Sequence, residues 1–193
     1  TIIIIFLKKN NLLEKYGLCS FKGNLKSFLY FIPLLAILTV NLWNGVRMNT
    51  SFINTILFIT SMICVGFLEE IIFRGFLFVG MSQNSIKSAI VVSSITFGIG
   101  HIVNLLNGGD FVPTLLQVFY AIAIGFLFTI MFYKSKSLIP CIIVHAVFNS
   151  LSIFSVENSS MTLDIITAVF LCVVSIGYAL WILKKTKTIK TEK

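Results

Sequence analysis

Long apolar stretches dominate this chain and constrain its fold more than any other feature. Roughly 17–25 apolar residues in a helix, at about 1.5 Å per residue, cross the hydrocarbon core of a membrane. We place six such spans at residues 27–43, 52–79, 87–106, 112–133, 138–154 and 163–183. The second is too long for one straight span and contains three charged residues, so we expect it to be steeply tilted or broken near Gly66 or Gly75.

The composition excludes a soluble globule. Of the 193 residues, 57% are hydrophobic and 11% are charged, whereas soluble domains carry about 25% charged residues. The 19 Phe and the runs of Ile, Leu and Val exclude disorder. We therefore predict an all-α, polytopic membrane helical bundle of about six transmembrane helices. It forms a single integral-membrane domain over residues 1–193, in which residues 1–7 would be the tail of a preceding, truncated span.

The basic residues sort to one side of these spans. By the positive-inside rule that side is cytoplasmic, so both termini of this chain should be cytoplasmic. The net charge of +8 would suggest nucleic acid in a soluble protein, but here we expect membrane lipid as a partner and no nucleic acid. The sorted residues are 13 of the 15 Lys and Arg: Lys8, Lys9, Lys15, Lys22, Lys26, Lys87, Lys134, Lys136, Lys184, Lys185, Lys187, Lys190 and Lys193.

Three charged residues lie inside the second span. Ionisable groups at membrane depth are costly and normally face a cavity or a partner. Glu70 and Arg74 are spaced i,i+4, so they meet on one helix face and can form an ion pair. Glu69 is turned about 100° away and has no cation on its own helix. A purely structural reading, in which all three lock two helices together, stays open at this point.

Both histidines of the chain also lie inside predicted spans. His101 follows Phe97 by four residues in the third span, and His145 lies one helical turn before Asn149 in the fifth. Counted from the cytoplasmic ends of their spans, Glu69, His101 and His145 lie roughly 16, 20 and 10 Å deep. Three helices can thus bring titratable groups to one slab of the membrane, although a single histidine in an apolar helix is more often an interhelical hydrogen-bonding residue.

These residue types together suit peptide-bond hydrolysis. A carboxylate and an imidazole that converge on one water molecule can activate it as general bases. A second imidazole and an Asn amide can donate hydrogen bonds to the oxyanion that develops. Other intramembrane proteases fit less well, because the sequence contains neither HExxH nor GxSxG. The sequence from Asn107 to Asp110 lacks the first Gly of an aspartyl protease motif and is typical of a turn.

Three motifs carry a family resemblance. Glu69-Glu70-x-x-x-Arg74, Phe97-x-x-x-His101 and His145-x-x-x-Asn149 occur in this order on separate spans. They resemble the three motifs of the CAAX-protease and bacteriocin-processing (CPBP, or Abi) family, which includes the Ras-converting endoprotease of eukaryotes. The resemblance covers about residues 52–155.

The resemblance implies a role for each motif residue. Counterparts of Glu69 and His101 activate the water, counterparts of His145 and Asn149 stabilise the oxyanion, and Glu70, Arg74 and Phe97 would support them. The family is called a metalloprotease family. A divalent metal such as zinc is therefore the cofactor that the resemblance raises, with Glu69, His101 and His145 as candidate ligands.

We therefore expect an intramembrane endopeptidase in a bacterial cell membrane that cleaves a membrane-associated peptide or protein. Maturation of a bacteriocin or pheromone, or self-immunity, is favoured over CAAX cleavage, because the six spans are fewer than the eight typical of the eukaryotic enzymes. Two alternatives from other classes remain. One is a non-catalytic bacteriocin-immunity or scaffold membrane protein, and the other is a small transporter whose buried Glu and His relay protons.

Overall fold

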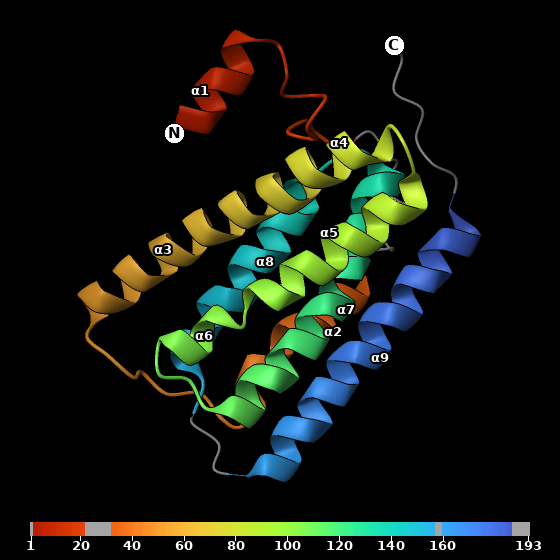
Figure 1. The fold of residues 1–193 in the computed structure, drawn as a ribbon. Coiled ribbons are helices and arrows are strands. Elements are labelled where there is room, and N and C mark those ends of the chain that lie inside the picture. Colours follow the sequence, from red (N-terminus) through yellow and green to blue (C-terminus); the bar gives the residue numbers. More distant parts are fainter. Residues whose placement is uncertain (1, 22–31, 157–159, 187–193) are drawn as a thin grey trace.

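The computed structural model describes residues 2–21, 32–156 and 160–186. Most of these residues are helical, and the only extended pairing among them is an isolated bridge between Val46 and Ser155. The structure confirms the predicted helical membrane bundle (Figure 1). Its helices are α1 (Ile2–Lys9), α2 (Ile32–Thr39), α3 (Phe52–Glu70), α4 (Val79–Ser82), α5 (Ile86–Gly100), α6 (Val103–Leu106), α7 (Phe111–Ser135), α8 (Ile139–Leu151) and α9 (Met161–Lys185).

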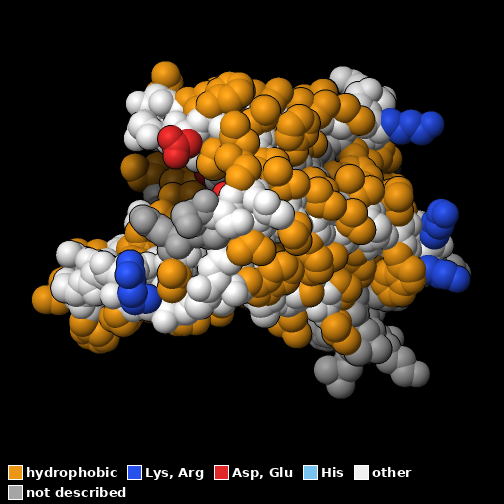
Figure 2. All heavy atoms as spheres, turned by 90° about the horizontal axis from the view of Figure 1, so that it is seen from below, with side chains coloured by type: hydrophobic (Ala, Val, Ile, Leu, Met, Phe, Trp, Pro, Cys, Tyr) orange, Lys and Arg blue, Asp and Glu red, His pale blue; other side chains and the backbone are white. Residues whose placement is uncertain are grey.

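Four helical stretches are long and apolar enough to cross a membrane. They are Phe52–Ser82, Ile86–Leu106, Phe111–Ser135 and Met161–Lys185, and two shorter apolar helices are Ile32–Leu42 and Ile139–Phe154. All six coincide with predicted spans, although residues 27–31 of the first span lie outside the described residues. Hydrophobic side chains cover much of the surface in the view from below Figure 1, with Lys and Arg side chains at its left and right edges (Figure 2). Exposed apolar surface of this extent suits contact with lipid and identifies a multi-pass membrane protein.

Helix α7 is the central element of the bundle. It packs against α5 on one side and α9 on the other. Of its most apolar stretch of 18 residues, 61% is buried inside the protein. Helix α3, in contrast, packs mainly against α8. The site described below lies where α3, α5, α7 and α8 approach one another.

The second predicted span is one continuous helical stretch of 31 residues, from Phe52 to Ser82. It is not broken at Gly66. Instead, α3 passes at Glu70 into a π-helical segment, Ile71–Phe78, which contains Gly75 and leads into α4. More than 40 Å of helix results, which exceeds a hydrocarbon core of about 30 Å. The stretch must therefore tilt or extend beyond the core, and π segments inside α-helices often mark functional positions.

Two glycines allow the helices that carry the site to approach closely. A Cβ atom on Gly66 of α3 would lie 3.0 Å from the backbone nitrogen of Ala146 on α8. A Cβ atom on Gly98 of α5 would lie 2.7 Å from the backbone nitrogen of Ile122 on α7. Any larger side chain at either position would push the two helices apart.

The predicted lysine side corresponds to one end of the bundle. The last residues of α7 and α9 and the first residues of α5 lie there, whereas α1 lies above α3, apart from them (Figure 1). The Lys134 ammonium ties two of these helix ends, because it donates hydrogen bonds to the carbonyl oxygens of Leu183 and Thr186 at 3.4 and 2.9 Å. Five of the sorted lysines lie outside the described residues: Lys22, Lys26, Lys187, Lys190 and Lys193.

At the opposite end, two joints that are far apart in sequence are tied together. The Arg47 amide donates a hydrogen bond to the Phe154 carbonyl oxygen at 2.9 Å. The Asn49 side-chain amide donates to the carbonyl oxygens of Ile153 and Ser155, both at 2.8 Å. The α2–α3 joint is thereby fixed to the end of α8.

Candidate active site

The centre of the site is a buried carboxylate, Glu70, at the end of α3. Its Oε1 atom lies 2.9 Å from Arg74 Nη1 in the π segment, and the predicted ion pair between these two residues is present. The same Oε1 atom lies 2.9 Å from His145 Nδ1 on α8. The side chains of Glu70 and Arg74 are both 0% exposed. One oxygen atom therefore joins α3, the π segment and α8.

The contact with Glu70 orients the imidazole of His145. An ionised carboxylate can only accept hydrogen bonds, so His145 Nδ1 carries the proton of this bond. His145 Nε2 is then directed at the other carboxylate, and it lies 3.6 Å from Glu69 Oε2. The Glu69 side chain is 34% exposed, whereas that of Glu70 is fully buried. Adjacent carboxylates thus contact opposite nitrogens of one imidazole, and only Glu69 can reach water.

The expectation that Glu69 has no cation on its own helix agrees with the structure, but its neighbour on another helix was not foreseen. A π-helix widens the turn and rotates the following residues, and α8 can meet α3 at any rotation about its axis. The spacing of residues in the sequence shows neither the rotation that a π-helix introduces nor the rotation of α8 about its axis. The sequence predicted that Glu69 and His145 share a depth, and the structure adds that they face one another.

An aromatic frame holds the charged groups. The Arg74 guanidinium carbon lies 4.1 Å from the centroid of the Phe97 ring. Phe97 also meets the rings of His101 and His145 edge to face, with centroids 5.3 and 5.6 Å apart. Phe128 on α7 closes the frame, with its ring centroid 6.2 Å from that of His145. Phe97 thus contacts both imidazoles and the guanidinium.

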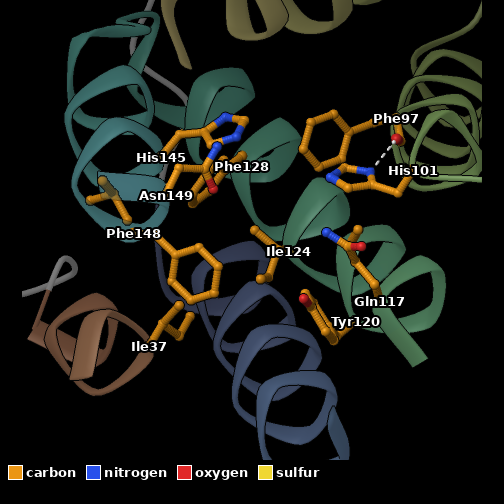
Figure 3. Close-up of a pocket in the computed structure, with 12 residues that line it drawn as sticks. Ile37, Phe97, His101, Gln117, Tyr120, Ile124, Phe128, His145, Phe148 and Asn149 are labelled. Carbon is orange, nitrogen blue, oxygen red and sulfur yellow. Dashed lines mark hydrogen bonds between the residues drawn. The ribbon is translucent and has the colours of Figure 1, made fainter. Parts of the chain in front are cut away.

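His101 lies at the C-terminal end of α5, beside the same frame. Its Nδ1 atom lies 3.2 Å from the Phe97 carbonyl oxygen, which can only accept, so Nδ1 carries the proton. In the neutral imidazole, Nε2 is then a free acceptor, and this atom points into a pocket (Figure 3). Glu69 and His145 are near enough to act on His101 electrostatically.

The pocket is walled by α2, α5, α7 and α8 and has about 40 Å³ of space that water can occupy. This volume admits water molecules but is too small for a peptide, so a substrate must part the helices. Glu69 contacts His145 but does not line this space. The lining side chains include His101, His145, Asn149, Gln117, Tyr120, Phe97, Phe128, Phe148, Ile37 and Ile124.

Four of the residues at this site were not predicted from the sequence. Phe128, Gln117 and Tyr120 come from α7, and Asn104 on α6 donates a hydrogen bond to Gln117 at 2.8 Å. The available signal was weak. Gln117 and Tyr120 are polar residues three apart in an apolar span, whereas the sequence argument followed titratable groups.

The site holds three residues of types that ligate metals, Glu69, His101 and His145. Across residues 2–21, 32–156 and 160–186, no group of three or more His, Cys, Asp or Glu side chains could hold a metal ion. Hydrogen bonds at Nδ1 of His145 and of His101 leave only the two Nε2 atoms to bind an ion, and Glu69 does not line the pocket into which His101 Nε2 points. As arranged, these described residues form no metal-binding group.

The fold and this site together define a multi-pass helical membrane protein with a buried cluster of carboxylates and imidazoles. The sequence model of a family described as type II CAAX prenyl endopeptidase Rce1-like matches residues 51–151, just over half of the chain. The chain therefore belongs to this family of CAAX-type intramembrane proteases, and the resemblance drawn from the three motifs is confirmed. No curated protein and no solved structure matches the chain.

Proposed function

We propose that this protein is an intramembrane endopeptidase in which Glu69 and His101 activate a water molecule. The single observation that carries the proposal is the pairing of the partly exposed Glu69 carboxylate with an imidazole that Glu70 orients from the opposite side. A structural ion-pair cluster alone would not need a second carboxylate with access to water. Family membership supplies the reaction class.

The proposed reaction transfers a proton first from water to the base and then from the base to the leaving amine. Glu69, with His101 Nε2 as the second acceptor, removes a proton from water, and the resulting hydroxide adds to the carbonyl carbon of the scissile peptide bond. The oxyanion then accepts hydrogen bonds from the Asn149 amide and from His145 Nε2. When the C–N bond breaks, the leaving amine takes the proton that the base has held.

The structure limits how His145 can act in this scheme. Its Nδ1 proton is used in the bond to Glu70, so only Nε2 remains to meet the oxyanion. Nε2 can donate only when it carries a proton, and Glu69 Oε2 lies 3.6 Å from it. Glu70 and Arg74 act as positioning residues, since they hold His145 without reaching the pocket.

The substrate class, the orientation and the setting follow from the same argument. We infer a membrane-associated peptide or protein substrate, because the site lies among apolar helices, and membrane lipid as the surrounding partner. Maturation of a bacteriocin or pheromone precursor, or self-immunity, in a bacterial membrane is the proposed role, with both termini cytoplasmic and one integral-membrane domain. A metal is given no step in this proposal.

A non-catalytic immunity or scaffold role is the second candidate. The observation that favours it is the connection of Glu70 to both Arg74 and His145, which links α3 to α8 whether or not any bond is cleaved. Such a protein would bind its partner equally well without a base at position 69.

Cleavage by purified protein in liposomes separates the two candidates. The probes are a farnesylated peptide that ends in a CAAX sequence and a library of lipid-anchored, fluorescence-quenched peptides. Glu69→Gln keeps the size of the side chain but cannot take a proton, so it should abolish cleavage while the protein stays folded. Asp110→Asn, at an exposed carboxylate outside the site, is the matched control and should cleave at the wild-type rate. Wild-type turnover by Glu69→Gln would refute the mechanism and favour the immunity role.

A further inference from the structure

The pocket has a polar wall opposite the two histidines that the proposed chemistry does not use. Asn104 Nδ2 on α6 donates a hydrogen bond to Gln117 Oε1 on α7 at 2.8 Å. This bond uses the acceptor of the Gln117 amide and leaves its nitrogen free. The Gln117 amide nitrogen and the Tyr120 hydroxyl both point into the pocket (Figure 3).

The pocket has the size and the chemistry of a water site. About 40 Å³ can be occupied by water, and a buried water needs roughly 10–15 Å³ measured in this way. A buried water also needs two to four polar partners. The lining provides four in the Gln117 amide, the Tyr120 hydroxyl, the Asn149 side chain and His101 Nε2. Among the described residues, the lining contains no Lys, Arg, Asp or Glu, so the space suits a neutral ligand.

The pocket also leads in a definite direction. Gln117, Ile124 and Phe128 lie on one face of α7, and their spacing covers about 16 Å of helix. The Gln117 end adjoins α6, near the end of the bundle, and the Phe128 end contacts His145. Ile37 on α2 and Phe148 on α8 cover its side. The pocket therefore lies between the polar side chains near α6 and the imidazoles, and the rest of its lining is mostly apolar.

We propose that Gln117 holds water in this pocket and supplies it to His101, and that Asn104 positions the Gln117 amide for this task. Hydrolysis inside a membrane consumes one water molecule per bond, and lipid does not provide it. The kinetic part of this inference rests on the proposed function. The existence of the water site does not.

Hydroxyl-radical labelling of the purified protein in detergent tests the site without any substrate. Side chains beside bound water are labelled, so Tyr120 and Phe148 should be labelled faster than Phe119, which is exposed on the outer face of α7. Gln117→Leu removes one hydrogen bond to the water and should lower labelling of Tyr120 about fivefold. Gln83→Leu, at an exposed Gln in the α4–α5 joint, should leave it unchanged.

Two further variants keep the test decisive if Gln117→Leu folds poorly. Gln117→Glu still accepts from Asn104 and still offers a polar atom to water, so labelling of Tyr120 should remain near the wild-type level. Asn104→Ala frees the amide to rotate and should lower labelling less than Gln117→Leu does. Wild-type labelling in a folded Gln117→Leu or Asn104→Ala protein would overturn the water site.

Kinetics with the peptide that the wild-type protein cleaves fastest test the supply of water. Gln117→Leu should lower kcat about fivefold and leave KM unchanged, since water and not peptide is lost. A raised KM with unchanged kcat would show that Gln117 binds the peptide, and would overturn the proposal. If the wild-type protein cleaves no probe, the proposed function fails, and the labelling result still decides whether the water site exists.

Discussion

Single atoms decide the behaviour of the site, and Glu70 Oε1 is the most consequential of them. It accepts from both Arg74 and His145, whereas Oε2 of the same carboxylate has no hydrogen-bond partner among the described residues. The two hydrogen bonds that compensate the buried charge of Glu70 are therefore both made to one oxygen atom. Loss of either partner leaves the carboxylate poorly compensated in an apolar setting.

Arg74→Ala should therefore destabilise the fold as well as abolish activity. Removing one partner of a buried ion pair costs roughly 3–5 kcal/mol, because the other charge remains buried. The double variant Glu70→Gln/Arg74→Gln removes both charges and should be more stable than Arg74→Ala. Thermal unfolding in detergent measures this order, with the exposed Lys87→Ala as control. Equal stability of all variants would show that the pair is not structural.

The local half of this cluster could be predicted from the sequence, and the long-range half could not. The Glu70–Arg74 pair follows from four-residue spacing on one helix. The Glu70–His145 bond joins residues 75 apart and depends on how far α8 is rotated about its axis. The position of His145 in its span gave its depth but not the direction of its ring. Because Nδ1 is bonded to Glu70, only Nε2 of His145 can act as the proposed oxyanion donor.

At the level of helices, the distance between α5 and α7 determines whether His101 faces the polar wall of the pocket. Gly98 sets that distance, because a Cβ atom there would meet Ile122 and the Val118 carbonyl oxygen. Gly100, two residues further along α5, has open space at its Cβ position. These two glycines form an internal comparison on one helix.

Gly98→Ala should lower stability and activity together. Overpacking of this kind costs roughly 1–3 kcal/mol, and the displacement carries His101 away from Gln117. Gly100→Ala meets no neighbouring atom and should leave both properties unchanged. The melting temperature in detergent and the cleavage rate measure the two effects. A tolerated Gly98→Ala would mean that α5 can shift without disturbing the site.

The helices themselves were largely predictable, because apolar length alone indicates a span. The π segment from Ile71 to Phe78 was not, since its apolar residues suit an α-helix equally well. The bond from Asn104 to Gln117 was also missed. These residues lie on two helices with the α6–α7 joint between them, and only the folded turn at that joint brings their side chains together.

Considered as a whole, the molecule is asymmetric in charge from one end to the other. The joints at one end hold Lys87, Lys134 and Lys136, and Asp110 lies at the other. Burial lowers the pKa of the Lys136 ammonium from its ordinary value, since this side chain is partly covered at the end of α7. The lysines at this end should hold it at the cytoplasmic surface.

Single-cysteine labelling tests this orientation in intact cells. Asn84 in the α4–α5 joint and Asn107 in the α6–α7 joint are both exposed and lie at opposite ends. In a background without the native cysteines, a membrane-impermeant thiol reagent should label Asn107→Cys from outside and label Asn84→Cys only after permeabilisation. Labelling of both from the same side would refute the topology.

The tie between the α2–α3 joint and the end of α8 gives the molecule a closed core. Arg47 and Asn49 meet residues 153–155, so the chain leaves and returns to nearly the same point after passing through every motif. The family match, 51–151, begins and ends just inside this tie. Helices outside residues 47–155 pack against a unit in which the chain has already passed through all three motifs. A change in the segments before and after this unit therefore does not reroute the chain between the motifs.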